Sequence, residues 1–275
     1  MPENYIAAAV RQSLASSGAS AASHERFGYP FHFYETIDST MTEAARLAEE
    51  GAPTGTLVMA EEQTAGRGRL GRQWVSEPGA GLYFTLILRP KIAPVAAPVL
   101  TLMAGVSLAE AVRPFVSDRV DLRWPNDLLI SGKKCAGILV EMRADPERAQ
   151  SERLWHVLMG IGINVNNTQF PEGLETEPTS LLLEAGQPIP RVDLLISVLK
   201  RLEEDYNSLL VDGAQPMLKQ FSTISSYAAG KRVRAGEDGH FITGTTAGLT
   251  PEGVLLLRRD DGGLEKIIAG HVRPL

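Results

Sequence analysis

Four short apolar runs, rich in strand-forming residues, follow one another in the middle of the chain, at 120–124, 128–130, 135–142 and 154–165. Tight polar turns separate them, and the Ser131–Gly132 turn predicts a hairpin between the second run and the third. Two earlier runs, at 56–60 and 82–88, are bounded by glycine and proline and also predict strands. Strands joined by hairpins indicate a mainly antiparallel sheet and argue against a doubly wound parallel one.

Helices are expected to accompany this sheet. After a predicted strand at 31–37, Thr40 and Glu43 form a capping box for a helix that ends near residue 50. Further helices are predicted at 3–17, 99–116 and 192–209, and the last places its apolar residues on one face. The small residues of 16–23 predict a flexible joint after the first helix.

The character of the sequence changes after residue 228. Between Lys231 and Leu275, three or four short strands are separated by glycine-containing turns, which predicts a small all-β barrel. We therefore expect an N-terminal extension at 1–30, a main domain at 31–228 and a C-terminal β domain at 229–275. The predicted fold class is α+β, with a mixed, mainly antiparallel central sheet and helices.

Charge and cysteine content limit the possible functions. The net charge of -6 argues against a surface that attracts nucleic acid or an anionic membrane. A single cysteine, Cys135, excludes an internal disulfide framework and indicates a reducing, cytoplasmic compartment. We expect no membrane span and no secretory signal, because we find neither an apolar stretch of sufficient length nor a basic N-terminal region.

The most informative segment is a loop at 62–74 that is rich in glycine and arginine. Glycine lets the backbone approach an anion, and a guanidinium offers charged donors in a fork, so the loop predicts a phosphate site. Because its charges repel one another, we expect it to stay mobile until a polyphosphate binds. Trp74 supplies an aromatic surface at its end. The alternating residues are Gly66, Arg67, Gly68, Arg69, Gly71 and Arg72.

Other interpretations of this loop remain open at this point. It formally matches the dinucleotide-binding pattern G-x-G-x-x-G, but no apolar helix follows it. It could also be a solvated basic loop, or an arginine–glycine segment that binds RNA, which the acidic net charge disfavours. No G-x-x-x-x-G-K-[ST] motif occurs, so any use of ATP does not involve a P-loop.

A second polar cluster, Arg123–Asp127, follows the predicted strand at 120–124. Its Asn-Asp pair favours a turn, which could be purely structural. Gly137 then interrupts one apolar strand, and Gly160 and Gly162 interrupt the next. Glycine weakens a strand unless something must approach its backbone, so the two strands predict a slot for a narrow apolar ligand.

Together, five segments resemble biotin–protein ligases, in the order and at the spacing of that family: Ile37-Asp-Ser-Thr40, Glu62-Gln-Thr-Ala-Gly-Arg-Gly-Arg-Leu-Gly-Arg-Gln-Trp74, Arg123-Trp-Pro-Asn-Asp127, Lys134-Cys-Ala-Gly-Ile-Leu-Val-Glu141 and Gly160-Ile-Gly-Ile-Asn164. The resemblance covers about residues 31–275. It implies a class II synthetase-like catalytic domain at 31–228 that binds biotin and ATP, and an SH3-like barrel at 229–275.

The resemblance implies a biotin site. Ser39, Thr40 and Gln63 would bind the ureido ring, whose polar edges need partners when they are buried. Gly137 and Gly160 would leave room for the bicyclic ring and its tail.

The resemblance also implies an ATP site. Lys134 would hold the biotin carboxylate and the α-phosphate while they react, and Arg67 would act with it on the reacting groups. Asp127 borders this centre and could either orient Lys134 or accept a proton from the incoming lysine; both roles stay open. The residues implied around the nucleotide, with Trp74 and Asn164 on the adenine side, are Gly66, Arg67, Gly68, Arg69, Arg72, Trp74, Asn126 and Asn164.

The implied reaction is ATP-dependent formation of biotinyl-5′-AMP with release of pyrophosphate, followed by transfer of biotin to a lysine of a biotin carboxyl carrier protein such as that of acetyl-CoA carboxylase. Mg²⁺ would accompany the nucleotide. Because AMP is the leaving group, no protein nucleophile is needed, and Cys135 is expected to be a core thiol. The five histidines form no i, i+4 metal pair, and His156 is expected to lie in the core. By analogy with the family, a homodimer is expected.

The chain departs from the family pattern at Met41, where asparagine is frequent, at Arg123, where lysine is common, and at His271, where an acid is common. Met41 leaves that edge of the biotin pocket less defined. Fewer than 31 residues precede the matching region, which is too short for the DNA-binding domain of family members that double as repressors, so we expect no DNA binding. The alternatives are a lipoate–protein ligase, which the glycine–arginine loop disfavours, and a biotin-responsive regulator without enzyme activity.

Overall fold

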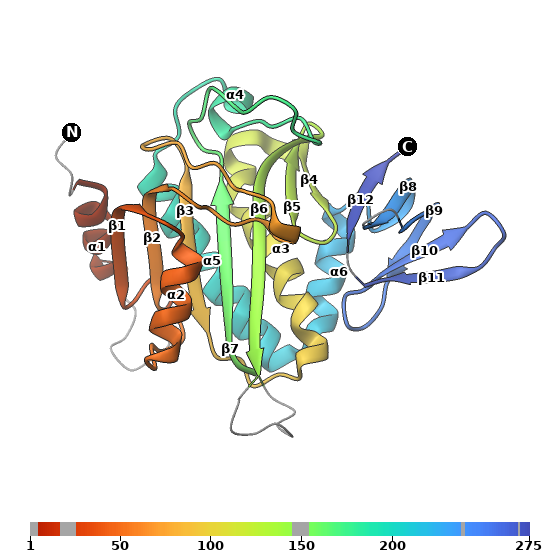
Figure 1. Cartoon of the computed structure of the whole chain (residues 1–275), viewed down its shortest axis with the longest axis horizontal. Helices are drawn as coiled ribbons and strands as arrows, with labels where there is room; N and C mark the ends of the chain where they lie inside the picture. Colours follow the sequence, from red (N-terminus) through yellow and green to blue (C-terminus); the bar gives the residue numbers. More distant parts are fainter. Residues whose placement is uncertain (1–4, 17–25, 145–153, 238–239, 269) are drawn as a thin grey trace.

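A seven-stranded mixed sheet forms the centre of the molecule (Figure 1), in a computed structural model that describes residues 5–16, 26–144, 154–237, 240–268 and 270–275. β1 and β2 are parallel, and every other neighbouring pair is antiparallel. The predicted α+β class with a mainly antiparallel sheet is therefore confirmed. In the order in which they pair, the strands are β1 (Phe31–Ile37), β2 (Leu57–Gln63), β3 (Leu82–Leu88), β7 (Leu154–Ile163), β6 (Lys133–Ala144), β5 (Asp127–Ile130) and β4 (Val120–Arg123).

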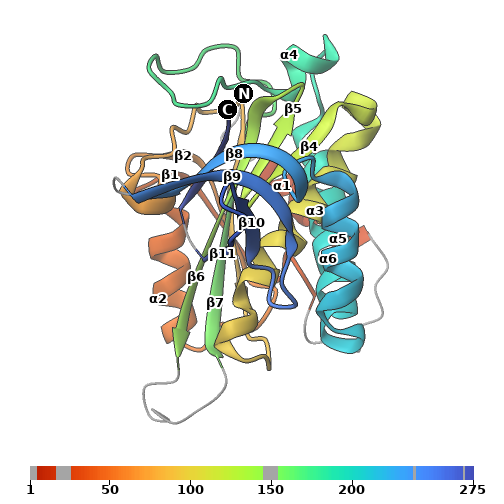
Figure 2. The same ribbon diagram turned by 90° about the vertical axis from the view of Figure 1, so that its right-hand side faces the viewer.

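Helices cover both faces of this sheet, which explains why every residue of β3 is buried. α2 (Thr40–Glu49) packs on β2, β3 and β7, whereas α3 (Ala97–Val116) packs on β4, β5 and β6. α5 (Arg191–Asp212) and α6 (Ala214–Ile224) lie against α3, and α1 (Tyr5–Ser16) lies against α5. Figure 2 shows α2 on one side of the sheet and α3, α5 and α6 on the other.

α3 is a core helix. The segment Pro94–Arg119 is long and apolar enough to cross a bilayer, which corrects our expectation that no stretch reaches that length. However, 71% of its apolar 18-residue window is buried inside the fold. A helix that is apolar on all sides fits this position, because the sheet covers one side of it and α5 and α6 cover another.

A five-stranded antiparallel sheet follows α6 and provides the β-rich C-terminal module that the turn pattern predicts. The order of pairing is β11-β10-β9-β8-β12, so the pairings among the described residues leave β11 and β12 at its two ends and do not themselves close the expected barrel. Its strands are β8 (Ala229–Glu237), β9 (His240–Leu249), β10 (Leu255–Arg259), β11 (Leu264–Ile267) and β12 (His271–Pro274).

Two buried hydrogen bonds join this module and the segment before it to β4. The indole Nε1–H of Trp124 donates to the carbonyl of Gly253 at 3.0 Å. The hydroxyl of Ser225 donates to the carbonyl of Leu122 at 2.5 Å. These contacts hold the C-terminal module beside the turn that links β4 to β5, and this turn carries site residues.

The structure corrects the predicted start of α2. The N-cap is Ser39, whose hydroxyl accepts from the backbone N–H of Met41 at 3.3 Å, so the predicted capping box of Thr40 and Glu43 is wrong. Glu43 instead accepts a hydrogen bond from Arg46, one turn further along the helix. Thr40 lies inside the helix and its hydroxyl turns toward the sheet, where it finds other partners.

Two helices escaped the sequence analysis for different reasons. α4 (Leu181–Ala185) is too short to show a helical period. α6 carries Pro216 near its start, which suggests a loop in the sequence but is tolerated in the first turn of a helix. The predicted joint at 16–23 lies, from residue 17 on, outside the described residues.

Candidate active site

Loops and strand ends from distant parts of the chain meet at one end of the central sheet. They are the loop after β2, the turn between β4 and β5, the start of β6 and the end of β7. Two adjoining pockets open there. Their volumes, which include the solvent space at the mouth of each pocket, are about 460 Å³ for the inner one and 1090 Å³ for the outer one. Both pockets are lined by Gly68, Arg69, Trp74, Asn126 and Lys134.

The smaller, inner pocket, lined also by Thr40, Met41, Gln63, Arg67, Gly137 and Gly160, has a floor of glycines. In the register of β6 and β7, Gly137 lies opposite Gly162, and Gly160 lies two residues further along on the same face. Without side chains, these positions leave a depression in the sheet. The slot that the sequence predicts is therefore present.

Two side chains fill this slot in the structure. A methyl carbon at Gly137 would lie 2.8 Å from the Trp74 ring, and one at Gly162 would lie 2.7 Å from its Nε1. A methyl carbon at Gly160 would lie 2.7 Å from the Met41 sulfur. The Trp74 ring and the Met41 thioether thus lie directly on the glycines, in the space that a narrow ligand would need.

Trp74 is held in the slot by packing rather than by a polar contact. Its buried Nε1–H has no hydrogen-bond partner among the described residues. An unpaired buried donor costs about 1–3 kcal/mol. The Lys134 ammonium lies 5.7 Å from the ring centre, a weak cation–π contact. A ligand that displaces this ring therefore breaks no hydrogen bond of Trp74.

The far end of the inner pocket is polar. The amide oxygen of Gln63 accepts from the backbone N–H of Thr40 at 2.9 Å and from its hydroxyl at 3.0 Å. The Gln63 amide nitrogen donates to the Ser76 hydroxyl at 3.1 Å. Ser39 caps α2 behind this group and does not line either pocket.

The larger, outer pocket carries more cations than carboxylates. Glu175 forms ion pairs with Arg72, at 2.6 Å, and with Arg273 of β12. Burial lowers the pKa of Arg69, and the nearby charge of Arg72 acts in the same direction. A pocket with such an excess of positive charge suits a polyanion. Its ionisable lining residues are Arg69, Arg72, Arg123, Asp127, Lys134, Glu175, His271 and Arg273.

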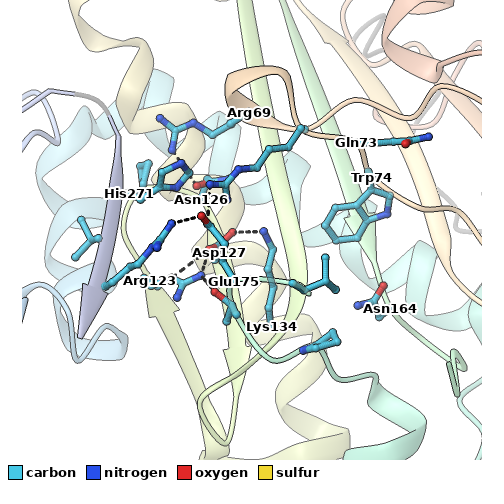
Figure 3. A pocket seen from close by; sticks show the side chains of 18 of the residues that line it. Arg69, Gln73, Trp74, Arg123, Asn126, Asp127, Lys134, Asn164, Glu175 and His271 are labelled. Atoms are coloured by element: carbon cyan, nitrogen blue, oxygen red, sulfur yellow. Dashed lines mark hydrogen bonds and ion pairs between the residues drawn. The ribbon is translucent and has the colours of Figure 1, made fainter. Parts of the chain in front are cut away.

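Lys134 stands where the two pockets join, and Asp127 fixes it there (Figure 3). Its Nζ lies 2.7 Å from one oxygen of the Asp127 carboxylate. The other oxygen accepts from Arg123 Nη2 at 2.5 Å and from Arg123 Nε at 3.1 Å. Burial alone would raise the pKa of Asp127, but the charges of Lys134 and Arg123 outweigh it and hold the pKa below its ordinary value. Asp127 is therefore an ionised anchor for two cations.

The glycine–arginine loop folds as a small hairpin. Gly68 donates to the Arg72 carbonyl at 2.7 Å, and Trp74 donates to the Gly66 carbonyl at 2.9 Å. Arg67 pairs with Glu141 at 2.5 Å, and Arg69 donates to the Asn126 side chain at 3.1 Å. The loop therefore has hydrogen-bond and ion-pair partners inside the protein. We had expected a segment whose charges only repel one another.

The structure brings the predicted site residues together. All of them except Ser39 and Gly66 line one of the two pockets. Gly66 is a buried residue of the glycine–arginine loop. A methyl group at this position would meet Gln63 and the backbone of Trp74. Asn164 lines the outer pocket, and its amide donates to the Thr179 carbonyl at 3.0 Å.

Several lining residues were not predicted as site residues. The segment 170–178 contributes Phe170, Leu174 and Glu175, which belong to no motif and lack regular structure. β12 contributes His271 and Arg273. Burial lowers the pKa of His271, and Arg72 adds to the effect, so this ring is neutral at pH 7. The departure of His271 from the family pattern was the one signal that pointed to β12.

Two reactive residues stay outside the site. Cys135 is buried, its thiol donates to the Asn164 carbonyl at 3.4 Å, and burial raises its pKa, which confirms the predicted core thiol. His156 is likewise buried in β7. Within the described ranges, no group of three or more histidine, cysteine or acidic side chains could hold a metal ion.

The end of the mixed sheet carries a slot for a narrow ligand beside a cationic pocket, a site where a small molecule and a phosphate-bearing one can lie side by side. Residues 33–164 match the Biotin/lipoate A/B protein ligase family, and residues 229–272 match the Biotin protein ligase C terminal domain. The chain belongs to the biotin protein ligase family and is a ligase.

Similar proteins cover nearly the whole chain. The bifunctional ligase/repressor BirA of Bacillus subtilis is 36% identical over 98% of this chain and 85% of its own. The biotin–[acetyl-CoA-carboxylase] ligase of Mycobacterium tuberculosis is 34% identical over 83% of this chain and 82% of its own. Among solved structures, the biotin protein ligase of Aquifex aeolicus in complex with biotin and ATP has a TM-score of 0.74, with 31% identity, over 88% of this chain and 98% of that chain.

Replacing Gly162 by alanine tests whether Trp74 occupies the slot. The new methyl group would clash with the indole, so the ring should leave and become exposed. We expect a red shift of tryptophan fluorescence and a loss of about 1–3 kcal/mol in the free energy of unfolding. Gly105→Ala is the control, because a methyl group there meets Leu122 at an ordinary 3.5 Å. An unchanged emission spectrum of Gly162→Ala would show that Trp74 lies elsewhere in solution.

Replacing Asp127 by asparagine tests the ionised anchor. A carboxyl whose pKa falls on folding stabilises the folded state above its unfolded pKa of about 3.9, and this contribution disappears as the pH falls through the folded value. Asp127→Asn should therefore lower the free energy of unfolding by about 3 kcal/mol at pH 7, because Lys134 and Arg123 lose their shared partner. Relative to wild type, the difference should shrink below about pH 4.

Urea unfolding at pH 7 and at pH 3 measures this difference. Asp118→Asn, at an exposed position, is the control and should show little change at either pH. A deficit of Asp127→Asn that is the same at both pH values would argue against an ionised Asp127.

Proposed function

We propose that this protein uses ATP to activate biotin as biotinyl-5′-AMP and then transfers the biotinyl group to a lysine of a biotin carboxyl carrier protein. The observation that carries the proposal is the position of Lys134, which lines both the glycine-floored inner pocket and the cationic outer pocket. A ligand in the inner pocket and a ligand in the outer pocket would meet at the Lys134 ammonium group. The Aquifex aeolicus ligase with biotin and ATP, and that of Leishmania major with biotinyl-5-AMP, support this assignment.

Biotin occupies the inner pocket in this proposal. Its ureido ring lies at the polar end, against Thr40 and Gln63, with Ser39 behind them. Its bicyclic ring and tail lie over Gly137 and Gly160, which requires Trp74 and Met41 to move. The carboxylate then reaches Lys134. Buried polar edges need partners, and the polar end provides them beside an otherwise apolar slot.

ATP occupies the outer pocket. Arg69 and Arg72 bind its phosphates, and Arg67 joins them on the inner side once it leaves Glu141. The triphosphate competes with Glu175 for Arg72, because both are anions. Asn164 lies on one side of Lys134 (Figure 3), where it binds the adenine, and Trp74 joins it there once its ring has left the slot.

The first step joins the two ligands. A carboxylate oxygen of biotin attacks the α-phosphorus, and the bond from that phosphorus to the bridging oxygen breaks, which releases pyrophosphate. Lys134 neutralises the negative charge of both reacting groups. Asn126 lines both pockets at this point and holds Arg69. Preorganised charge of this kind provides most of the rate in such reactions.

The second step transfers the acyl group. The acceptor lysine, as its neutral amine, attacks the biotinyl carbonyl carbon, the carbon–oxygen bond to phosphate breaks, AMP leaves, and the proton that the amine loses passes to solvent. Of the two roles left open for Asp127, we propose orientation of Lys134. A carboxylate whose pKa is held low by two cations is a weak base and does not readily take a proton from an amine.

Mg²⁺ accompanies ATP in this proposal and neutralises charge on the phosphates. Among the described residues, no acidic cluster could cage a metal ion, and the two carboxylates of the outer pocket are both ion-paired. Mg²⁺ characteristically binds through substrate phosphates with one or two carboxylates. The donor set therefore fits an ion held mainly by the nucleotide, with Asp127 and Glu175 nearby.

Biotin-dependent exchange between ATP and pyrophosphate tests the function. We expect exchange with biotin and none with lipoate. Lys134→Ala and Arg67→Ala should reduce it by about a hundredfold or more, because each removes charge that stabilises the transition state. Lys133→Ala is the matched control, since its neighbouring ammonium pairs with Glu177 and lines neither pocket. Exchange with lipoate alone would favour the lipoate ligase, and none with either acid would leave a regulator.

We further propose that the protein works in the cytoplasm as a homodimer, without binding DNA or membranes. The net charge of -6 supports the absence of DNA and membrane binding, and the single cysteine supports a reducing, cytoplasmic compartment. The homodimer rests on analogy with the family. In a gel-shift experiment with promoter DNA, addition of biotin and ATP should cause no retardation. A specific, biotin-dependent complex would contradict it and would indicate a regulatory role.

A further inference from the structure

A chain of buried hydrogen bonds leads from the central sheet to the polar end of the inner pocket. The Thr85 hydroxyl, on β3, lies 2.9 Å from the Thr40 hydroxyl. Thr40 binds Gln63 through its backbone N–H and its hydroxyl, and Gln63 binds Ser76. Thr85 is 0%, Thr40 3% and Ser76 8% exposed. Thr85 itself does not line the pocket and lies behind Thr40.

The direction of each hydrogen bond in this chain follows from its fixed donor. The backbone N–H of Thr40 can only donate, so the Gln63 atom that faces it must be the amide oxygen. An amide oxygen only accepts, so the Thr40 hydroxyl must give its single proton to it. The hydroxyl of Thr40 can then only accept from Thr85, and Thr85 must be the donor.

This ordering decides what the protein offers to a ligand. Both lone pairs of the Gln63 oxygen are taken, and one of its two amide protons goes to Ser76. No group in the described part of the chain takes the second amide proton of Gln63 or the second lone pair of the Thr40 hydroxyl. The polar end therefore presents one donor beside one acceptor. That pair complements a ligand with a carbonyl next to an N–H, as in a cyclic urea.

We propose that Thr85 is a positioning residue that fixes the Thr40 hydroxyl as an acceptor for the ligand and thereby contributes to selection of a urea-bearing acid. The inference rests on the proposed use of biotin. Thr85 lies opposite Gly160 in the register of β3 and β7, so the same place in the sheet provides both the glycine floor and the hydroxyl anchor. Without the Thr85 proton, the Thr40 hydroxyl keeps only its hydrogen bond to Gln63, and its acceptor lone pair is no longer held toward the pocket.

A simpler role for Thr85 must be distinguished from this one. Threonine is common in strands, and a buried threonine side chain can serve only to fill space. A structural role predicts that its removal weakens every ligand equally, or lowers stability alone. The positioning role predicts a loss confined to ligands that carry the urea.

The experiment measures ATP–pyrophosphate exchange in wild type, Thr85→Val and Thr85→Ser. Valine keeps the branched shape and removes the hydroxyl, whereas serine keeps the hydroxyl. For Thr85→Val we expect the KM for biotin and for dethiobiotin, which share the urea, to rise about tenfold, the effect of roughly one hydrogen bond. The KM for ATP and inhibition by octanoate, which has no urea, should not change. Thr85→Ser should stay within about twofold of wild type.

The outcomes separate the two proposals. If wild type shows no biotin-dependent exchange, the proposed function fails and the role of Thr85 fails with it. If wild type is active, an unchanged biotin KM in Thr85→Val overturns the positioning role alone. An equal loss for biotin, ATP and octanoate also overturns it, in favour of a structural role. If Thr85→Val does not fold, Thr85→Ala, which also lacks the hydroxyl but cannot overfill the core, is judged by the same criteria.

Discussion

The site depends on the ion pair between Asp127 and Lys134. Asp127 is the first residue of β5 and Lys134 the second of β6. In the antiparallel pairing of the two strands Lys134 lies opposite Leu129, two residues from Asp127, and the two charged groups meet. Arg123, at the end of β4, binds the same carboxylate from the next strand. One buried anion thus fixes two cations, one from β4 and one from β6, and holds the ammonium group where the pockets meet. Without it, Lys134 and Arg123 would repel each other without a shared partner.

The glycines of β6 and β7 are the second constraint. They weaken the strands that carry them, yet they create an apolar depression beside Lys134. Trp74 covers that depression, and its indole N–H has no hydrogen-bond partner among the described residues, while Thr40 and Gln63 bind each other at its polar end. A ligand can therefore displace the ring that covers the slot. Trp74 ends the loop that carries the arginines, so a residue of this loop covers the slot.

Sequence reasoning predicted the strands of the central sheet well, because hairpins keep their partners close in the chain. It failed where a local signal was ambiguous or absent. Ser39 rather than Thr40 caps α2, because two adjacent hydroxyls compete for the cap and Thr40 finds partners in the sheet. Glu175 and Arg273 reach the outer pocket from an irregular segment and from the C-terminal module, and no spacing in the sequence connects them.

The sequence by itself determined the antiparallel sheet, the cationic loop and the glycine-interrupted strands, since these depend on residue types that lie close together along the chain. Five motifs in the right order also determined the family. Only the tertiary structure decided that Trp74 fills the slot, that Glu175 bridges two arginines, and that Thr85 orders the hydrogen bonds behind the pocket. These contacts join residues far apart in the chain, and their geometry is set by how β3, β6, β7 and β12 pack, which no local pattern encodes.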